Sequence, residues 1–383
     1  MTNTFSPSAV ISLDNVLHNI KEIRSRISSS FGVIAVVKDN AYGCGAASIA
    51  GILESKADVD FFAVASAPEA FSLRSSGIGS PILILGKCTE QDLGKGAGQS
   101  MVFTCNSIDD FDEWQSYSFP VNFHLNINTG MNRLGLNPNE LSDFAQRLLT
   151  SGHLHCQGIF THMASADCPG TITVDTQLTL FRDALSRLAA HGCHPEMIHI
   201  ANSATLLRFP PDFGTHIRPG IALYGCLPDP RQSFDTKLKP VLTLKGYIVA
   251  LRQVPAGTPI SYGGNYTTVH PTIIATIGIG YAHGVPRYLG NKGSVLIDGK
   301  RFPIAGNVTM DYIMADVGAA ADICIGDEAI IIGEQGDEII TPDEIAAIGN
   351  TIGYEVLCNI GTGLTRNYTY RGETVASMCG LHF

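Results

Sequence analysis

The sequence lacks an excess of positive charge and has no long apolar run. Its 25 Lys and Arg residues are outnumbered by 35 Asp and Glu residues, which gives a net charge of −10. Because nucleic acids and anionic membranes attract basic surfaces, this balance argues against either as a main partner. No apolar run reaches the ~18 residues that a transmembrane helix needs. Residues 1–8 also lack the basic start and apolar stretch of a signal peptide, so we expect a cytoplasmic protein.

Metal-binding and disulfide patterns are missing as well. The ten cysteines are scattered, with no Cys-x-x-Cys pair and no accompanying histidine spacing typical of zinc sites. We therefore predict free, mostly buried thiols in a reducing compartment and assign no metal ligand.

The sequence does contain a long alternation of short apolar runs with amphipathic segments. At 383 residues and 45% hydrophobic content, the chain is expected to form two domains. Eight strand-like runs separated by helical patterns predict an α/β fold, an N-terminal (β/α)₈ TIM-type barrel. The predicted strands are 33–37, 61–64, 82–85, 101–103, 121–126, 157–161, 197–200 and 215–218, and the predicted helices include 45–56, 68–75, 107–117, 140–149 and 174–191.

The pattern changes from about residue 238 onwards. β-branched runs at 242–250, 272–277, 294–297 and 329–332 are separated by turn-forming sequences, and only 342–351 has a helical pattern. Residues 229–233 are the expected linker. We therefore predict a barrel domain at 1–235 and a mostly β domain at 236–383.

Cationic and hydrogen-bonding residues follow the predicted barrel strands. Because the carboxyl ends of parallel strands open onto one face, these residues are expected to share one site. They are Lys38 and Tyr42 after the first strand, Arg133 after the fifth, His162 after the sixth, Asn202 and Ser203 after the seventh, and Arg218, Gly220 and Ile221 after the eighth. An amine, two guanidinium groups and backbone N–H donors suit a ligand with a phosphate and an aldehyde. Pyridoxal 5'-phosphate meets that description.

Several motifs make a resemblance specific. They are Val36-Val-Lys-Asp-Asn-Ala-Tyr-Gly43, His162, His199-Ile-Ala-Asn-Ser203, Arg218-Pro-Gly-Ile-Ala-Leu-Tyr-Gly225, Ser261-Tyr-Gly263 and Met310-Asp311. In this order, over almost the whole chain, they closely resemble alanine racemase. The resemblance implies a pyridoxal-phosphate enzyme that interconverts L- and D-alanine and supplies D-alanine for peptidoglycan. It also implies a head-to-tail homodimer in which the C-terminal domain completes the partner's active site.

The resemblance implies a role for each catalytic residue. Lys38 would bind the cofactor covalently and act as a base on one face of the substrate, and Tyr262 of the partner subunit would serve the other face. An unperturbed tyrosine, with a pKa of about 10, is a poor base at neutral pH, so a relay through His199 and Arg218 is expected to favour its phenolate. Arg218 would also donate to the pyridine nitrogen, which makes the ring a weaker electron sink than an Asp partner would.

Other positions match cofactor- or substrate-binding residues of the family. The phosphate would be bound around Tyr42, Ser203, Gly220, Ile221 and Tyr354. Asn202 would also contact the cofactor, and His162 would pack on the ring. Arg133 would approach the cofactor hydroxyl and the substrate carboxylate, and the Met310 N–H would complete carboxylate binding. Tyr281 and Asp311 are candidates for gate or supporting positions.

Three positions depart from the family pattern. Asn126 stands where many members carry a carbamylated lysine that supports Arg133. An asparagine cannot be carbamylated, so its amide oxygen, a neighbouring carboxylate or an anion such as chloride must balance Arg133. Asn307 replaces an arginine common near the substrate entrance, and Asn132 replaces a usual glycine.

Each candidate residue taken singly has an ordinary structural explanation, such as a packed tyrosine or a surface ion pair, but their joint order favours a site. The alternatives are a broad-specificity or serine racemase, because of Asn126, an amino-acid decarboxylase of the same design, and a non-catalytic pyridoxal-phosphate carrier. A carrier would not need residues 240–383, and the retention of Tyr262 favours a racemase.

Overall fold

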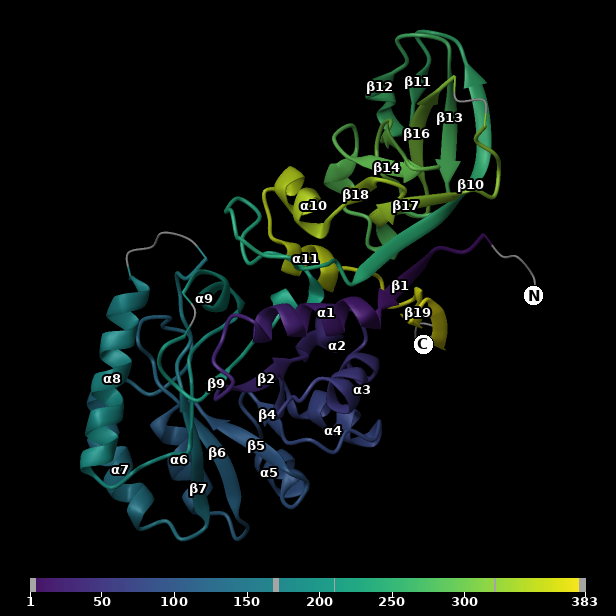
Figure 1. Cartoon of the computed structure of the whole chain (residues 1–383). Coiled ribbons are helices and arrows are strands. Elements are labelled where there is room, and N and C mark those ends of the chain that lie inside the picture. The colour runs from purple at the N-terminus through teal and green to yellow at the C-terminus, as the bar shows by residue number, and fades with distance from the viewer. Residues whose placement is uncertain (1–4, 168–171, 210, 320–321, 379–383) are drawn as a thin grey trace.

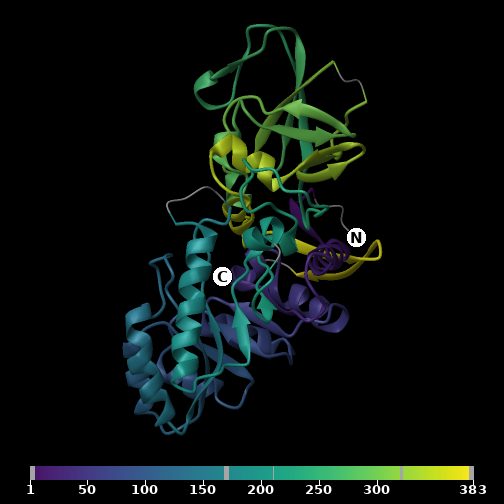
Figure 2. The ribbon, with the colours of Figure 1, turned by 60° about the vertical axis from the view of Figure 1, so that its left-hand side comes forward.

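The computed structural model describes residues 5–167, 172–209, 211–319 and 322–378. These residues form two lobes, a barrel with its surrounding helices and a second lobe made mostly of strands (Figure 1). A view turned by 60° keeps the lobes apart and shows helices α10 (Pro342–Gly349) and α11 (Gly353–Cys358) between them (Figure 2). The molecule is therefore elongated, with the two lobes end to end.

Eight parallel strands close the barrel in chain order, which confirms the predicted (β/α)₈ fold class. The barrel closes where β9 returns to β2, through the pairs Gly32 with His216 and Val33 with Ile217. The apolar side chains of these short strands are buried, as expected for a parallel sheet covered on both faces. The barrel strands are β2 (Gly32–Val36), β3 (Phe61–Val64), β4 (Ile82–Ile84), β5 (Met101–Cys105), β6 (Val121–Asn126), β7 (Leu154–Phe160), β8 (Met197–His199) and β9 (His216–Ile217).

Helices connect the barrel strands, and the predicted ones are present with ends shifted by about one or two residues. Helix α1 (Leu13–Arg24) begins after Ser12, whose side chain accepts a hydrogen bond from the Asn15 N–H. The others are α3 (Ala46–Lys56), α4 (Ala67–Ser75), α5 (Glu90–Gly96), α6 (Ile108–Gln115), α7 (Leu141–Leu149), α8 (Val174–Ala190) and α9 (Ser203–Arg208). Across the described ranges, none of the helices has the length and apolar character that crossing a membrane requires.

The second lobe is built around β10 (Leu242–Val254), which pairs with several neighbours along its 13 residues. Strand β1 (Ser8–Ser12) precedes the barrel in sequence but belongs to this sheet, antiparallel to β10 and parallel to β19 (Thr365–Tyr370). The remaining strands are β11 (Pro259–Ile260), β12 (Tyr266–Thr267), β13 (Thr272–Ile277), β14 (Ser294–Ile297), β15 (Lys300–Pro303), β16 (Ile313–Gly318), β17 (Glu328–Gln335), β18 (Glu338–Ile340) and β20 (Glu373–Met378). The lobe is mostly β, as predicted.

One expectation for this lobe is wrong. The sequence pattern predicts a single helix at 342–351, but α11 follows α10 as a second one. With six residues, α11 is too short for an apolar periodicity to be recognised.

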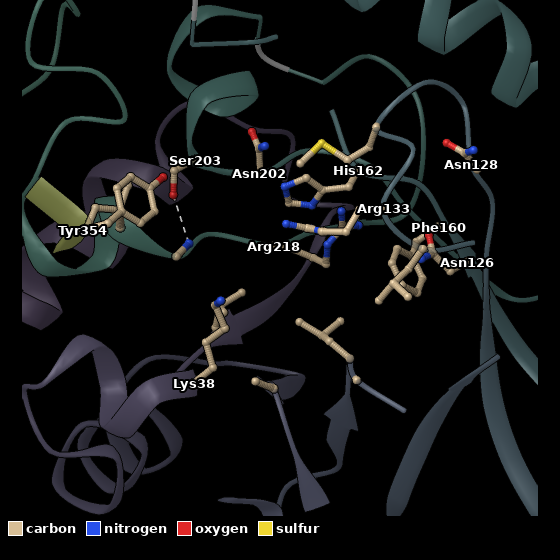
Figure 3. Close-up of a pocket in the computed structure, with 18 of the residues that line it drawn as sticks. Lys38, Asn126, Asn128, Arg133, Phe160, His162, Asn202, Ser203, Arg218 and Tyr354 are labelled. Carbon is tan, nitrogen blue, oxygen red and sulfur yellow. Dashed lines mark hydrogen bonds between the residues drawn. The ribbon is translucent and has the colours of Figure 1, made fainter. Parts of the chain in front are cut away.

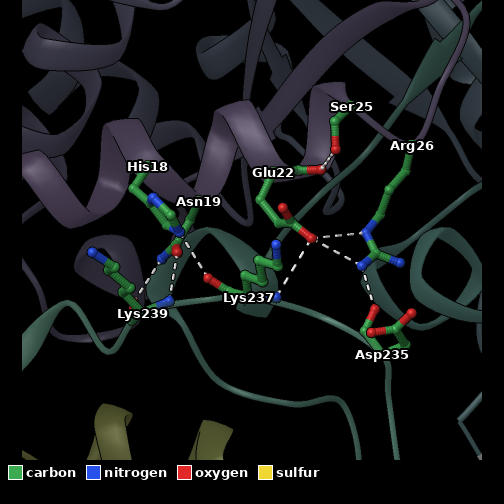
Figure 4. A network of polar contacts seen from close by, with 8 residues as sticks. All are labelled: His18, Asn19, Glu22, Ser25, Arg26, Asp235, Lys237 and Lys239. Atoms are coloured by element: carbon green, nitrogen blue, oxygen red, sulfur yellow. Dashed lines mark hydrogen bonds and ion pairs between the residues drawn. The ribbon is translucent and has the colours of Figure 1, made fainter.

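The segment 235–239, which leads from the barrel to β10, is fastened to α1 (Figure 4). Asn19 is fully buried there, and its Nδ2 donates hydrogen bonds to the carbonyl oxygens of Leu223 and Lys239. Its Oδ1 accepts a hydrogen bond of 2.8 Å from the Lys239 N–H. Further polar contacts join His18 to Lys237, Glu22 to Lys237 and Arg26, and Arg26 to Asp235. These contacts fix the direction in which the chain leaves the barrel.

We predict that Asn19→Leu lowers the free energy of unfolding by about 2–4 kcal/mol, because it leaves the buried Leu223 carbonyl and the partly buried N–H and carbonyl of Lys239 without their partner. Urea denaturation followed by circular dichroism measures this. His18→Ala is the control, since the hydrogen bond of His18 to Lys237 is exposed and its loss should cost less than about 0.5 kcal/mol. Equal effects of the two changes would contradict the prediction.

Candidate functional site

A cavity of about 450 Å³ opens at the carboxyl ends of the barrel strands. Most of the residues predicted for the site line it, namely Lys38, Tyr42, Asn126, Arg133, His162, Asn202, Ser203, Arg218, Gly220, Ile221 and Tyr354. His162, Arg133 and Arg218 gather on one side of the cavity, and Lys38 points in from the other (Figure 3). Residues separated by more than 300 positions in the chain thus share one space.

Lys38 leaves β2 through a left-handed turn. Asp39, Asn40, Ala41 and Tyr42 have φ angles of 54°, 53°, 54° and 52°. For residues other than glycine this conformation costs about 1–2 kcal/mol each, so neighbouring groups must hold it. Asn40 supplies part of that support, since its backbone oxygen accepts from the Gly45 N–H and its Oδ1 accepts from the Ala46 N–H. The Lys38 Nζ lies 3.4 Å from an Asp39 carboxylate oxygen.

Residues of the C-terminal half close around this turn. Arg366 is buried, and its Nε donates a 2.8 Å hydrogen bond to the Gly43 carbonyl. A Cβ atom at Gly43 would lie 2.6 Å from the Leu357 carbonyl oxygen, and one at Gly45 would overlap the Tyr368 hydroxyl. Both glycines also have positive φ angles, so only glycine fits these positions.

Hydroxyl and N–H groups collect at one end of the cavity. The Ser203 Oγ accepts hydrogen bonds from the Gly220 N–H at 2.9 Å and the Ala222 N–H at 3.2 Å, which leaves its own O–H free to donate (Figure 3). The rings of Tyr42 and Tyr354 lie 5.9 Å apart. Burial raises the pKa of both phenols, so both stay protonated and can donate to an anion. Asn202 caps α9 through its Oδ1, which accepts from the Thr205 N–H.

Arg218 is buried beside the cavity, and protein acceptors take most of its donors. Its NH1 donates to the Nδ1 and the carbonyl oxygen of His199, and its NH2 donates to the carbonyl oxygens of Thr161 and Ile200. Among the described residues, only the Nε–H of this guanidinium lacks a protein acceptor. Burial lowers the pKa of Arg218 to about 9. A buried cation with one free donor suits a ring nitrogen or another uncharged acceptor.

Two buried histidines extend from Arg218. Because Arg218 donates to Nδ1 of His199, His199 carries its proton on Nε2, and this N–H donates to Nδ1 of His124 at 2.8 Å. Burial lowers the pKa of His124 to about 3 and that of His199 well below its usual range. Both rings are therefore neutral, and the His124 Nε2 has no partner within the described ranges. The predicted contact of His199 with Arg218 is present.

His162 is neutral for the same reason. Burial, together with the charges of Arg218, Arg133 and Lys38, lowers its pKa to about 3. Its ring therefore adds no charge to a cavity wall that already carries three cations.

Asn126 presents its amide in one orientation. Its Nδ2 donates a 2.8 Å hydrogen bond to Oδ1 of Asn106, and the Nδ2 of Asn106 donates to the Leu85 carbonyl oxygen. If either amide were rotated by 180°, its oxygen would face the oxygen of its acceptor, so both orientations are fixed. The carboxamide oxygen of Asn126 is thus the atom available to the cavity. The Asn106 carbonyl also accepts from the Gly135 N–H, which ties the Arg133 loop to the same asparagine.

The structure explains the departure at Asn132. Its φ is 54°, a conformation that favours glycine but that asparagine tolerates better than most residues. The Asn132 Oδ1 and N–H both bond to the side chain of Asn128.

Four predicted residues lie away from this cavity. Tyr262, Tyr281, Met310 and Asp311 are on the surface of the β lobe, with Tyr262 75% exposed. Two hydrogen bonds keep Tyr281 beside Met310, from the Tyr281 N–H to the Thr309 carbonyl and from the Ala282 N–H to the Met310 carbonyl. In the described part of this chain, none of the four lines the cavity.

Several lining residues were not predicted. Phe160 stacks on the His199 ring at 4.8 Å and lies under the Arg218 guanidinium, and Ala65, Leu85 and Gly86 follow the second and third barrel strands. Their position at the end of a strand or just past it was the available signal, but apolar and glycine residues carry no chemistry that singles them out.

Known proteins resemble the chain over nearly its full length. The families described as "Alanine racemase, N-terminal domain" and "Alanine racemase, C-terminal domain" match residues 11–228 and 241–368. The alanine racemase of Symbiobacterium thermophilum is 38% identical, covering 96% of this chain and 97% of that protein. The crystal structure of alanine racemase from Bacillus anthracis with bound L-Ala-P is 35% identical with a TM-score of 0.89, covering 98% of this chain and 97% of that one. An alanine racemase structure from Clostridium difficile 630 is 33% identical with a TM-score of 0.90, covering 98% and 99%. By these matches, the chain belongs to the alanine racemase family of isomerases.

Proposed function

We propose that this protein interconverts L- and D-alanine with pyridoxal 5'-phosphate as its cofactor and supplies D-alanine for peptidoglycan in the cytoplasm. The observation that carries the proposal is one cavity in which the Lys38 amine faces the buried Arg218, with hydroxyl donors around Ser203 at one end. The substrate is inferred from the relatives, which are named alanine racemases and match almost the whole chain.

The cavity residues fit this cofactor. The protonated hydroxyls of Tyr42, Tyr354 and Ser203 would hold its phosphate, the free Nε–H of Arg218 would donate to its ring nitrogen, and the Lys38 amine would bind its aldehyde. When bound, the cofactor withdraws electrons from Cα of the amino acid and so makes the Cα hydrogen acidic. Arg218 keeps its own protons, because its other donors are held by backbone oxygens and His199.

Inversion at Cα needs one base on each face of the substrate. We assign one face to Lys38, whose Nζ points into the cavity (Figure 3). For the other face we propose Tyr262 of the partner subunit, because Tyr262 is 75% exposed and lies on the β lobe of its own chain. The buried Arg218 guanidinium would favour the phenolate that this role requires. A head-to-tail homodimer follows from this assignment, with Met310 and its neighbours covering the partner's cavity.

Arg133 is the proposed binding group for the substrate carboxylate, and Asn126 replaces the carbamylated lysine of other members. Because the Asn126 amide is fixed in one orientation, its oxygen and not its N–H group faces the cavity. A carboxamide oxygen accepts hydrogen bonds from a guanidinium without carrying a full negative charge. We therefore favour the Asn126 oxygen over a bound chloride as the partner of Arg133.

The first test is exchange of the Cα hydrogen in deuterated water, followed by proton NMR with chiral product analysis. We expect exchange with racemisation for L- and D-alanine, and rates at least about 100-fold lower for serine and larger amino acids, because a close pocket discriminates by a few kcal/mol. Comparable rates for large side chains would instead support a broad-specificity racemase, the alternative that Asn126 suggests. Bound cofactor without exchange would support a carrier.

Subunit sharing predicts complementation. Lys38→Ala and Tyr262→Phe homodimers should each lose most of the activity, and Lys38→Ala should also lose the yellow colour of covalently held cofactor. Mixed dimers contain one cavity with both bases intact, so mixing the two inactive chains should restore up to about a quarter of wild-type activity by random pairing. Mixing either variant with itself is the control. No recovery in dimers shown to be mixed would argue against sharing.

Carbamylation is predicted to play no part. Wild-type activity should be unchanged when bicarbonate is removed by degassing and then restored. Asn126→Lys is the matched variant, since it reintroduces a lysine that bicarbonate can modify, and its activity should rise on adding bicarbonate. If the activity of the wild-type protein required bicarbonate, that result would contradict the proposed role of the Asn126 oxygen.

A further inference from the structure

The turn that carries Tyr262 has an unusual backbone. Ser261, directly before Tyr262, has φ 65° and ψ −177°, a region that residues other than glycine rarely occupy. Such a conformation costs about 1–3 kcal/mol and persists only where neighbouring groups determine it. Gly263 and Gly264 follow with φ angles of 77° and 58°.

Asn307 makes three hydrogen bonds with this turn from a different segment of the chain. Its Nδ2 donates to the Tyr262 carbonyl oxygen at 2.7 Å, and its Oδ1 accepts from the Asn265 Nδ2 at 3.0 Å. Its own carbonyl oxygen accepts from the Ser261 Oγ at 2.9 Å. One asparagine therefore contacts the residue before Tyr262, Tyr262 itself and the end of the turn.

Two further groups complete the support. The Asn291 Nδ2 donates to the Asn265 carbonyl at 3.1 Å, and the Asn291 Oδ1 accepts from the Gly306 N–H at 2.6 Å. A Cβ atom at Gly306 would lie 2.5 Å from the Ser261 Cβ, so a glycine next to Asn307 is needed for the two segments to approach.

These contacts matter because packing within its own chain does little to hold Tyr262. Its side chain is among the most exposed large apolar groups of the described chain, at 75% exposure. The direction of its ring therefore depends on the backbone of the turn, and that backbone depends on Asn307. An arginine at this position, as is common in the family, has no acceptor for the Asn265 amide, whereas asparagine both donates and accepts.

We infer that Asn307 is a positioning residue that holds the Tyr262 turn in the geometry that proton transfer requires. The inference rests on the proposed role of Tyr262 as a base in the partner's cavity. A base displaced by about 1 Å can lose up to about 100-fold in rate, so hydrogen bonds to the turn are enough to affect turnover.

The test compares Asn307→Asp with Asn15→Asp in the dimeric holoenzyme. Aspartate keeps the size of asparagine and still accepts from Asn265, but it cannot donate to the Tyr262 carbonyl. Asn15 offers a matched control, because its Nδ2 makes the same type of bond, 2.7 Å to the Pro240 carbonyl, away from the turn. Asn265→Ser serves as a second variant that removes only the bond to Asn307 Oδ1.

We expect kcat/KM of Asn307→Asp to fall about 10- to 100-fold, by the same factor for both enantiomers, since L- and D-alanine are equally stable in water. Proton transfer at Tyr262 becomes rate-limiting. The primary deuterium isotope effect with [2-²H]alanine should therefore rise for the enantiomer whose Cα hydrogen faces Tyr262 and not for the other. Asn265→Ser should raise the isotope effect for the same enantiomer by a smaller amount, and Asn15→Asp should leave that isotope effect unchanged.

A purely structural role for Asn307 would lower the amount of active dimer and leave both isotope effects at wild-type values, and that result would overturn the inference. Failure of the proposed function can be distinguished from failure of this inference. In that case the wild-type protein would not racemise alanine, or the Tyr262→Phe variant would keep full activity, whatever the activity of Asn307→Asp.

Discussion

The left-handed turn after Lys38 is the constraint on which the site depends. Four residues from Asp39 to Tyr42 hold positive φ angles, and the barrel strand alone cannot stabilise them. Arg366 donates a stabilising hydrogen bond to Gly43, and Leu357 and Tyr368 approach Gly43 and Gly45 closely. All three lie more than 300 positions away in sequence. The second half of the chain therefore contributes to the turn that presents Lys38 and Tyr42.

The charged side chains that line the cavity are all positive. Lys38, Arg133 and Arg218 bring positive charge to its wall, while His162 and His199 are kept neutral by burial and Tyr42 and Tyr354 stay protonated. Asn126 contributes an uncharged amide oxygen to the same wall. A site with this balance attracts anions, and a ligand bearing a phosphate together with a substrate carboxylate would neutralise it. The burial of Arg218 next to neutral histidines is tolerable because backbone oxygens accept most of its hydrogens.

Much of this architecture follows from local sequence pattern. The eight barrel strands are short, largely apolar runs, and residues that carry chemistry follow them, so both the fold and the cavity could be predicted. Contacts between distant segments could not. Periodicity says nothing about β1 pairing with β19, about Asn106 fixing the amide of Asn126, or about Asn307 bonding to Tyr262. Such polar contacts are single pairs without a repeating signal, and α11 is too short to show one.

The two residues proposed as bases share a structural device. Lys38 precedes a run of positive φ angles and Tyr262 follows a single one, so each stands where the chain leaves regular structure abruptly. A side chain inside a strand or helix points where the repeat directs it, and its neighbours crowd it. A side chain at a strained turn can project away from its own lobe, provided that polar contacts hold the backbone. Arg366 does this for the Lys38 turn and Asn307 for the Tyr262 turn. In both turns the supporting hydrogen bonds go to the main chain and not to the side chain of Lys38 or Tyr262.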